Sequence, residues 1–219
     1  MKPTSHRDSV LNAIRAAIRD VPASETPDDV VVPRDYLTAD PSPGGEMIGQ
    51  FIERVSEYKA TVSRVSAAGL PAAIARACEA KAIKRLVVPA DLPGGWAPEG
   101  VVLLSEPGLT IDQLESSDGV LTACALGIAQ TGTVVLDAGP GQGRRAITLL
   151  PDYHLCVIRE DQVVGLVPEA VARLGTAAAT PARPMTFISG PSATSDIELN
   201  RVEGVHGPRV LEVIVVVAE

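Results

Sequence analysis

Small hydroxyl and acidic side chains are concentrated near the carboxyl end of the chain. The segment reads Ser189-Gly-Pro-Ser-Ala-Thr-Ser-Asp-Ile-Glu198 and is followed by Val202-Glu-Gly-Val-His-Gly-Pro208. Gly190 and the proline after it predict a turn at the end of a strand, and Ser192 or Ser195 can cap a short helix that follows. Hydroxyls at such a strand-to-helix turn suit a carbonyl or anionic oxygen.

An imidazole and a carboxylate belong to the same two segments. If the fold brings His206 close to Asp196, the two side chains could act as a general acid and base, and they are the best candidates for catalysis. The alternative is that the aspartate only caps a helix and that the histidine bonds to backbone in a turn. Both interpretations remain open from the sequence.

A glycine-rich segment, Asp137-Ala-Gly-Pro-Gly-Gln-Gly-Arg-Arg145, lies between a predicted strand and a helix-like stretch over residues 146–150. Its glycines let the backbone approach a ligand closely, and Arg144 and Arg145 offer guanidinium groups for a carboxylate or phosphate. The segment is neither a Walker A loop nor a Gly-x-Gly-x-x-Gly loop. It is therefore either an anion site or a surface loop whose arginines are solvated.

A third polar segment, Gly127-Ile-Ala-Gln-Thr-Gly-Thr133, interrupts two apolar stretches. Gln130, Thr131 and Gly132 predict a turn that presents amides and hydroxyls to a ligand, or simply a polar hairpin turn. His154 opens a later strand and is expected to face the same strand-end cleft as Gln130. The three histidines show no His-x-x-x-His spacing, so we expect no metal site. We expect no cofactor either.

Together these segments predict one ligand site at strand ends, where open α/β sheets bind their ligands. A small carboxylate or phosphate is the expected ligand. The residues expected to contact it are Gln130, Thr131, Gly132, Arg144, Arg145, His154, Ser189, Gly190, Ser192, His206 and Gly207.

Hydrophobic periodicity predicts the elements that must position these residues. Helices are predicted over residues 5–20, 46–55, 71–82, 110–115 and 168–174 and near Asp196, and strands over residues 60–65, 86–88, 101–104, 120–126, 131–136, 155–157, 185–188 and 210–217. This alternation predicts an α/β fold with three α/β/α layers around a mainly parallel sheet. Prolines between residues 22 and 43 predict an extended linker. We therefore expect a helical, proline-rich arm over residues 1–44 and an α/β domain over residues 45–219.

Composition excludes some classes of function. The 219 residues carry a formal net charge of −8 and only 3% aromatic side chains, so we expect no nucleic-acid or membrane partner. Cys78, Cys124 and Cys156 are too few and too dispersed for an iron–sulfur cluster and are expected to be buried free thiols. The polar start and the short apolar runs predict no signal peptide or membrane span, so the cytoplasm is the expected location.

Three stretches carry a resemblance to a known family. They are the segment 127–133, the segment Leu149-Leu-Pro-Asp-Tyr-His154, and the segment 189–198 with Gly204-Val-His-Gly-Pro208. Over about residues 45–219 the chain resembles the LUD-domain family, and within it the lactate utilization protein C branch. The resemblance implies a fold similar to that of sugar-phosphate isomerases, CoA transferases and folate cyclo-ligases. It also implies companion proteins, at least one with iron–sulfur clusters, in the oxidation of L-lactate to pyruvate.

The chain departs from this family at one position. Members often have glutamate where this sequence has Gln130. The related CoA transferases use a glutamate nucleophile, which a glutamine side chain cannot replace. The resemblance therefore does not carry CoA-transferase chemistry to this chain.

Three hypotheses for function follow. The preferred one is a non-redox component of an L-lactate utilization system that binds a small anionic metabolite at strand ends. The second is a stand-alone, isomerase- or transferase-like enzyme for a phosphorylated or carboxylated small molecule, with His206 and Asp196 as acid and base. The third is a structural subunit whose N-terminal helix and arm dock another chain.

Overall fold

The computed structural model describes residues 5–22, 24–26, 29, 31–178, 183–190 and 207–218, and for residues 176–178 it describes only the backbone. Residues 1–36 and residues 37–219 form two units, which are described separately. The first unit contains helix α1 (His6–Ala17), which begins after Ser5, whose hydroxyl accepts a hydrogen bond from the Asp8 amide at 3.2 Å. This local cap confirms the predicted helix start, and none of the side chains of α1 is buried.

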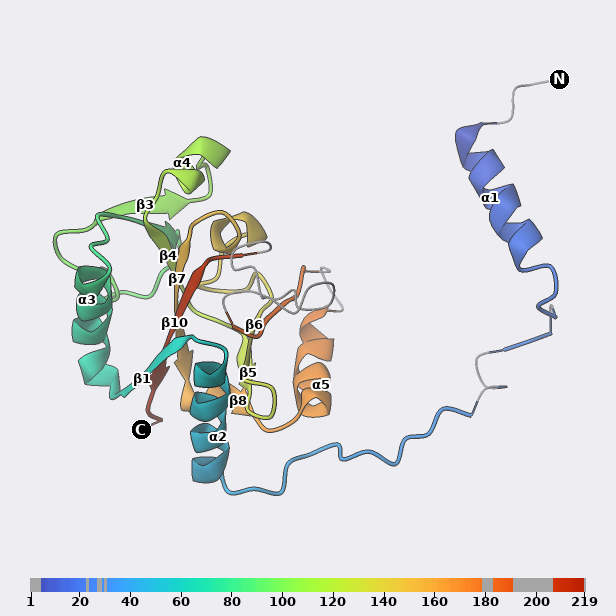
Figure 1. The fold of residues 1–219 in the computed structure, drawn as a ribbon, viewed down its shortest axis with the longest axis horizontal. Helices are drawn as coiled ribbons and strands as arrows, with labels where there is room; N and C mark the ends of the chain where they lie inside the picture. Colours follow the sequence, from blue (N-terminus) through green and yellow to red (C-terminus); the bar gives the residue numbers. More distant parts are fainter. Residues whose placement is uncertain are drawn as a thin grey trace. The chain divides into compact units, whose positions relative to one another are not determined.

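A six-stranded sheet is the centre of the second unit (Figure 1). Its strands, in spatial order, are β1 (Thr61–Val65), β10 (Val210–Val216), β7 (Tyr153–Arg159), β4 (Gly119–Thr122), β2 (Arg85–Pro89) and β3 (Val102–Glu106). All neighbouring strands are parallel, with Val120 opposite His154 and Leu86 opposite Gly119. The apolar run Val213–Val216 of β10 suits its position inside this sheet, because both faces of the sheet are covered there.

A smaller second sheet packs on one face of the first. Its strands, in spatial order, are β8 (Val163–Val164), β5 (Leu126–Ile128), β6 (Thr133–Leu136) and β9 (Thr186–Ile188). The predicted single strand over residues 120–126 is wrong, because the chain leaves the first sheet after Thr122 and enters the second at Leu126. At the break, the Gln162 amide donates hydrogen bonds to the carbonyls of Cys124 and Ala125, at 2.8 and 3.2 Å.

Helices complete the layers, and the α/β fold with a mainly parallel sheet is confirmed. Helix α3 (Leu70–Ala80) and the six-stranded sheet share one apolar core. Helix α2 (Gly44–Glu57) buries Ile48, Phe51 and Val55 in a second core between the two sheets. Helix α5 (Val167–Ala178) covers the outer face of the smaller sheet, and the short helix α4 (Ile111–Glu115) packs Leu114 near β3.

Short 3₁₀ turns and buried thiols fill out the unit. The turns are η2 (Ala67–Gly69), η3 (Arg145–Thr148) and η4 (Glu160–Gln162). Helix α4, predicted over residues 110–115, begins with a capping box formed by Thr110 and Gln113. The three cysteines are free and buried, as predicted. No helix in the described part of the chain is long and apolar enough to cross a membrane.

Strands β2 and β4 are neighbours whose following connections run in opposite directions. The chain leaves β2 for the edge strand β3, whereas after β4 it crosses to the second sheet and returns in β7, on the far side of β4 from β2. In parallel α/β sheets, ligands bind in the crevice outside the carboxyl ends of such a pair of strands. The topology therefore indicates a site beyond Pro89 and Thr122.

Candidate functional site

An open cleft of about 260 Å³ lies at the carboxyl ends of β2 and β3, bordered by the glycine-rich loop of residues 137–144. We name it the carboxyl-edge cleft. It is lined by Pro89, Ala90, Asp91, Glu106, Pro107, Ala138, Gly139, Gly143 and Arg144. The two acidic side chains follow or end strands of the sheet, and the arginine comes from the loop, so the cleft joins segments far apart in the chain.

Asp137 holds the glycine-rich loop in shape. This buried carboxylate accepts hydrogen bonds from the Gly139 amide at 3.0 Å and the Gln142 side-chain nitrogen at 2.8 Å, and its other oxygen pairs with Arg183 at 2.7 Å. The Gln142 side-chain oxygen in turn accepts a hydrogen bond from the Asp137 amide at 2.7 Å. Both buried side chains are thus paired, and the loop is fixed by its own hydrogen bonds.

Two glycines bring this loop against the strand ends. Gly141 and Gly143 have φ angles of +69° and +67°. The Gly141 amide donates to the Asp91 carboxylate at 2.9 Å, and the Gly141 carbonyl accepts from the Ala123 amide at 2.7 Å. A Cβ atom on Gly143 would lie 2.6 Å from Cδ1 of Ile147. Glycine is required here by the positive φ and by the close approach.

Arg144 extends from the loop to the end of β3. Its Nε atom forms an ion pair with the buried Glu106, and its Nη2 atom donates to the Leu109 carbonyl at 2.8 Å. The second Glu106 oxygen accepts a hydrogen bond from the Leu109 amide at 3.1 Å. The Arg144 side chain is nevertheless 49% exposed and lines the cleft. A guanidinium held in this way, with donors still exposed, can bind a carboxylate or phosphate.

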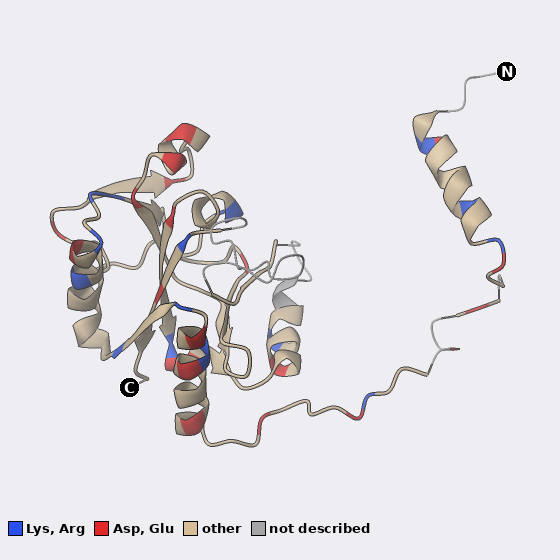
Figure 2. Ribbon diagram, in the orientation of Figure 1, with Lys and Arg blue, Asp and Glu red and all other residues tan. Residues whose placement is uncertain are grey.

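The carboxyl-edge cleft is not a basic surface. Asp91 and Glu106 lie in it together with Arg144, and helix α4, which follows β3, carries further acidic residues (Figure 2). A group of high negative charge would be repelled by these carboxylates. The cleft therefore suits a small ligand of low net charge rather than a polyanion.

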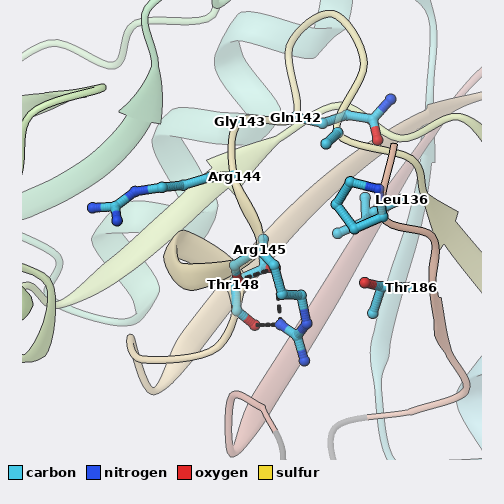
Figure 3. Close-up of a pocket in the computed structure, with 9 residues that line it drawn as sticks. Leu136, Gln142, Gly143, Arg144, Arg145, Thr148 and Thr186 are labelled. Carbon is cyan, nitrogen blue, oxygen red and sulfur yellow. Dashed lines mark hydrogen bonds between the residues drawn. The ribbon is translucent and has the colours of Figure 1, made fainter. Parts of the chain in front are cut away.

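Arg145 points away from Arg144 (Figure 3), and both residues line a second, smaller cavity, which also borders Thr148 and Thr186. Its guanidinium donates to the carbonyl and the hydroxyl of Thr148, at 2.8 and 3.1 Å. Burial lowers the pKa of Arg145. The adjoining cavity measures about 10 Å³, which is room for about one water molecule. Arg145 is thus a half-buried cation bonded to Thr148, and it does not line the open cleft.

His154 is fully buried in the six-stranded sheet. Its Nε2 atom forms a hydrogen bond of 2.8 Å with the Thr122 hydroxyl, and its Nδ1 atom has no partner in the described part of the chain. Burial, and second the charge of Arg145, lower the pKa of His154 to about 3. The ring is therefore neutral near pH 7. It lines neither the carboxyl-edge cleft nor the turn that contains Gln130.

Three hydroxyl groups form a hydrogen-bonded row at the other end of β6, which we name the hydroxyl row. The Thr133 hydroxyl lies 2.7 Å from the Thr131 hydroxyl and 2.7 Å from the Ser189 hydroxyl. Beside them, Gln130 is exposed, and its backbone N–H donates to the Gly165 carbonyl at 3.0 Å. The predicted hairpin turn is thus present, with its hydroxyls paired to one another.

Two glycines pack the hydroxyl row against the end of helix α2. A Cβ atom on Gly132, which has a φ of +57°, would lie 2.6 Å from the carbonyl carbon of Arg54. A Cβ atom on Gly190, which has a φ of +86°, would lie 2.5 Å from Cβ of Tyr58. These close approaches give both glycines a packing role.

The predicted ligand residues therefore do not form a single site. One group lies at the hairpin end of β6 and comprises Gln130, Thr131, Gly132, Ser189 and Gly190. Arg144 lies beyond the opposite end of this four-residue strand, which spans about 13 Å, so the two groups do not share one small ligand. Ser192, Asp196 and His206 lie outside the described residues. Gly207 is described and lies shortly before β10.

Sequence reasoning did not single out Asp91 and Glu106. Each is an acidic residue at or just beyond the end of a buried parallel strand, and that position was the available signal. The partner of Glu106 is 38 residues away in the chain, which no local pattern indicates. Within the described residues, no group of three or more His, Cys, Asp or Glu side chains could hold a metal ion.

The chain is an α/β protein that belongs to the LUD domain family, since the family's sequence model matches residues 48–216. A lactate utilization protein C from Deinococcus radiodurans is 50% identical over 182 residues, which are 83% of this chain and 84% of that relative. Another from Halalkalibacterium halodurans is 39% identical over 101 residues, which are 45% of this chain and 44% of that relative.

A solved structure supports the same assignment. The crystal structure of a DUF162 family protein from Deinococcus radiodurans superposes with a TM-score of 0.71 and 44% identity. The match covers 80% of this chain and 99% of that chain. Fold and family are therefore established by sequence and by structure.

Proposed function

We propose that this chain is a component of an L-lactate utilization system, in which L-lactate is oxidised to pyruvate. The observation that carries the proposal is the 50% identity to a lactate utilization protein C over 84% of that protein's length. The matched LUD domain, residues 48–216, includes both strand ends, the glycine-rich loop and the cleft between them. The part of the chain that is shared is thus the part that builds the candidate site.

In this proposal the chain itself does not carry the electrons. Oxidation of L-lactate to pyruvate releases two electrons, which iron–sulfur partner proteins accept, and two protons, which pass to solvent. Cys78 lies in the core on the α3 side of the six-stranded sheet, whereas Cys124 and Cys156 lie in the core on the other side. Burial raises the pKa of Cys78 to about 11. Thiols that are separated by the sheet do not make the four-thiolate site of a cluster, which supports a non-redox role.

The proposed metabolite is a small carboxylate bound in the carboxyl-edge cleft by Arg144. Three observations support this location over the hydroxyl row: the position at the diverging connections of β2 and β4, the volume of about 260 Å³, and the 49% exposure of the guanidinium. The hydroxyls of the row are engaged with one another.

Growth on L-lactate tests the role. A strain without this gene should fail to grow on L-lactate as sole carbon source but grow normally on pyruvate, and the wild-type gene should restore growth. Unimpaired growth of the deletion strain on L-lactate would overturn the role.

Two arginine variants in the same strain test the site. Arg144→Gln should not restore growth, because it removes the proposed carboxylate partner. Arg64→Gln is the matched control, since Arg64 is also an exposed arginine paired with a glutamate, Glu160, but lies on β1 at the other edge of the sheet. It should restore growth. Equal restoration by both variants would remove Arg144 from the proposal.

A further inference from the structure

The carboxyl-edge cleft holds a hydrogen-bond donor and an acceptor side by side. Glu106 and Arg144 are in direct contact, and both line the cleft. Glu106 receives one hydrogen bond from Arg144 and one from the Leu109 amide. A carboxylate offers about four acceptor positions, so Glu106 can accept further hydrogen bonds but donates none while it is ionised. The ion pair is thus an acceptor-only group next to a donor-only group.

The donor side of the pair also has capacity left. Arg144 uses Nε for Glu106 and Nη2 for the Leu109 carbonyl, and its Nη1 group makes no hydrogen bond within the described part of the chain. A guanidinium has five N–H donors, which suit a planar carboxylate. A ligand carboxylate can therefore approach the exposed edge of Arg144 without breaking the pair with Glu106.

We propose that the Glu106–Arg144 pair makes the cleft selective for 2-hydroxy acids over 2-oxo acids. This inference rests on the proposed function and names the class of ligand for the same cleft. A 2-hydroxy acid has its carboxylate and its hydroxyl on adjacent carbons, so one small molecule offers an acceptor for Arg144 and a donor for Glu106. Its carboxylate accepts from Arg144, and its hydroxyl donates to Glu106.

A 2-oxo acid fits the same place poorly. Its carbonyl oxygen only accepts hydrogen bonds, so it would face the Glu106 carboxylate lone pair to lone pair. A polar group of the site that one ligand satisfies with a hydrogen bond and another leaves unpaired discriminates strongly between the two ligands. Asp91, the other acid of the cleft, adds to this preference because it is also an acceptor. In a system that oxidises L-lactate, the cleft would hold the substrate and release the product.

Calorimetric titration of the full chain with L-lactate, propionate and pyruvate tests the selectivity. Propionate has the carboxylate but no oxygen at the adjacent carbon. The wild-type protein should bind L-lactate about tenfold or more tightly than pyruvate, with propionate between them. This comparison uses no variant, so it does not depend on whether a mutant folds. Pyruvate bound as tightly as L-lactate would overturn the inference.

Glu106→Gln should reduce the preference for L-lactate over pyruvate to about threefold or less, because the amide can donate to the oxo group. Glu160→Gln is the matched control, since Glu160 is also paired with an arginine but at the other edge of the sheet. It should keep the wild-type ratio. A Glu106→Gln protein that unfolds like the wild type yet keeps the full preference would also overturn the inference.

The two proposals fail in distinguishable ways. If all three acids bind equally well and Arg144→Gln abolishes binding of each, the result supports the carboxylate site and refutes the selectivity. If none of the acids binds the wild-type protein, the result refutes both the proposed site in the cleft and the selectivity.

Discussion

Acidification should destabilise the protein through His154. The folded state holds the pKa of this buried ring at about 3, below its ordinary value of 6.5, because burial and the charge of Arg145 oppose protonation. Its neutral form therefore contributes stability above pH 6.5 that is lost as the pH falls toward 3. At 1.36 kcal/mol per pH unit, the free energy of unfolding should fall by about 2–3 kcal/mol between pH 7.5 and pH 4.5 from this residue alone.

Urea unfolding of the wild-type protein and of His154→Gln at pH 7.5, 6.5, 5.5 and 4.5 measures this contribution. Glutamine cannot be protonated in this range, and its amide can still bond to Thr122. Carboxylates with lowered pKa values, such as that of Glu160 beside Arg64, titrate equally in both proteins and cancel in the difference. The wild-type protein should lose about 2–3 kcal/mol more than the variant. The same pH dependence in both proteins would refute the assignment of a low pKa to His154.

Three further predictions concern packing and burial. Gly132→Ala should lower the free energy of unfolding by about 2 kcal/mol or more, because its Cβ atom would lie 2.6 Å from the backbone of α2. Gly175→Ala is the control: a Cβ atom there has no atom within 4 Å, so this change should raise the free energy of unfolding by about 0.5 kcal/mol. Urea unfolding compares the two variants, and equal effects would count against the close contact. Ser189→Ala and Thr133→Val should each lower the free energy of unfolding by about 1 kcal/mol, and the double variant should lower it by less than the sum of the two. Strict additivity in this double-mutant cycle would show that the hydroxyl row is not coupled. Cys78, whose pKa burial raises to about 11, should be alkylated at pH 8 in urea but not in the native protein, as mass spectrometry would show; rapid native labelling would contradict its burial.

The elements that could be predicted from the sequence are those whose signals are local. Ser5 caps α1 and the Thr110–Gln113 box begins α4, because a capping residue and its partner are three residues apart. The apolar run of β10 indicated a strand covered on both faces, and it pairs with β1 and β7 inside the sheet. These features need no knowledge of the rest of the chain.

The break between the two sheets could not be predicted in this way. An apolar run continues from Val120 to Leu126 apart from the small residues at its centre, so periodicity indicates one strand. What divides it is the Gln162 amide, which binds two carbonyls at the break from 37 and 38 residues away. A change of sheet depends on such distant hydrogen bonds, and the local hydrophobic periodicity does not indicate them.

The candidate site shows the same division between local and distant information. The glycine-rich loop and Arg144 were recognised from composition, because close backbone approach requires glycine and anion binding favours arginine. The acid that pairs with Arg144 ends strand β3, 38 residues earlier in the chain, and it was missed. The distance between Gln130 and Arg144 follows from the length of β6, a four-residue strand that separates two turns which the sequence alone placed together.

A structure of the protein with bound L-lactate is the most direct test that the carboxyl-edge cleft is a carboxylate site. We expect the lactate carboxylate on the exposed edge of Arg144 and the lactate hydroxyl within about 3 Å of a Glu106 oxygen. A lactate molecule bound at the hydroxyl row of Thr131, Thr133 and Ser189, with the carboxyl-edge cleft empty at saturating L-lactate, would contradict this account.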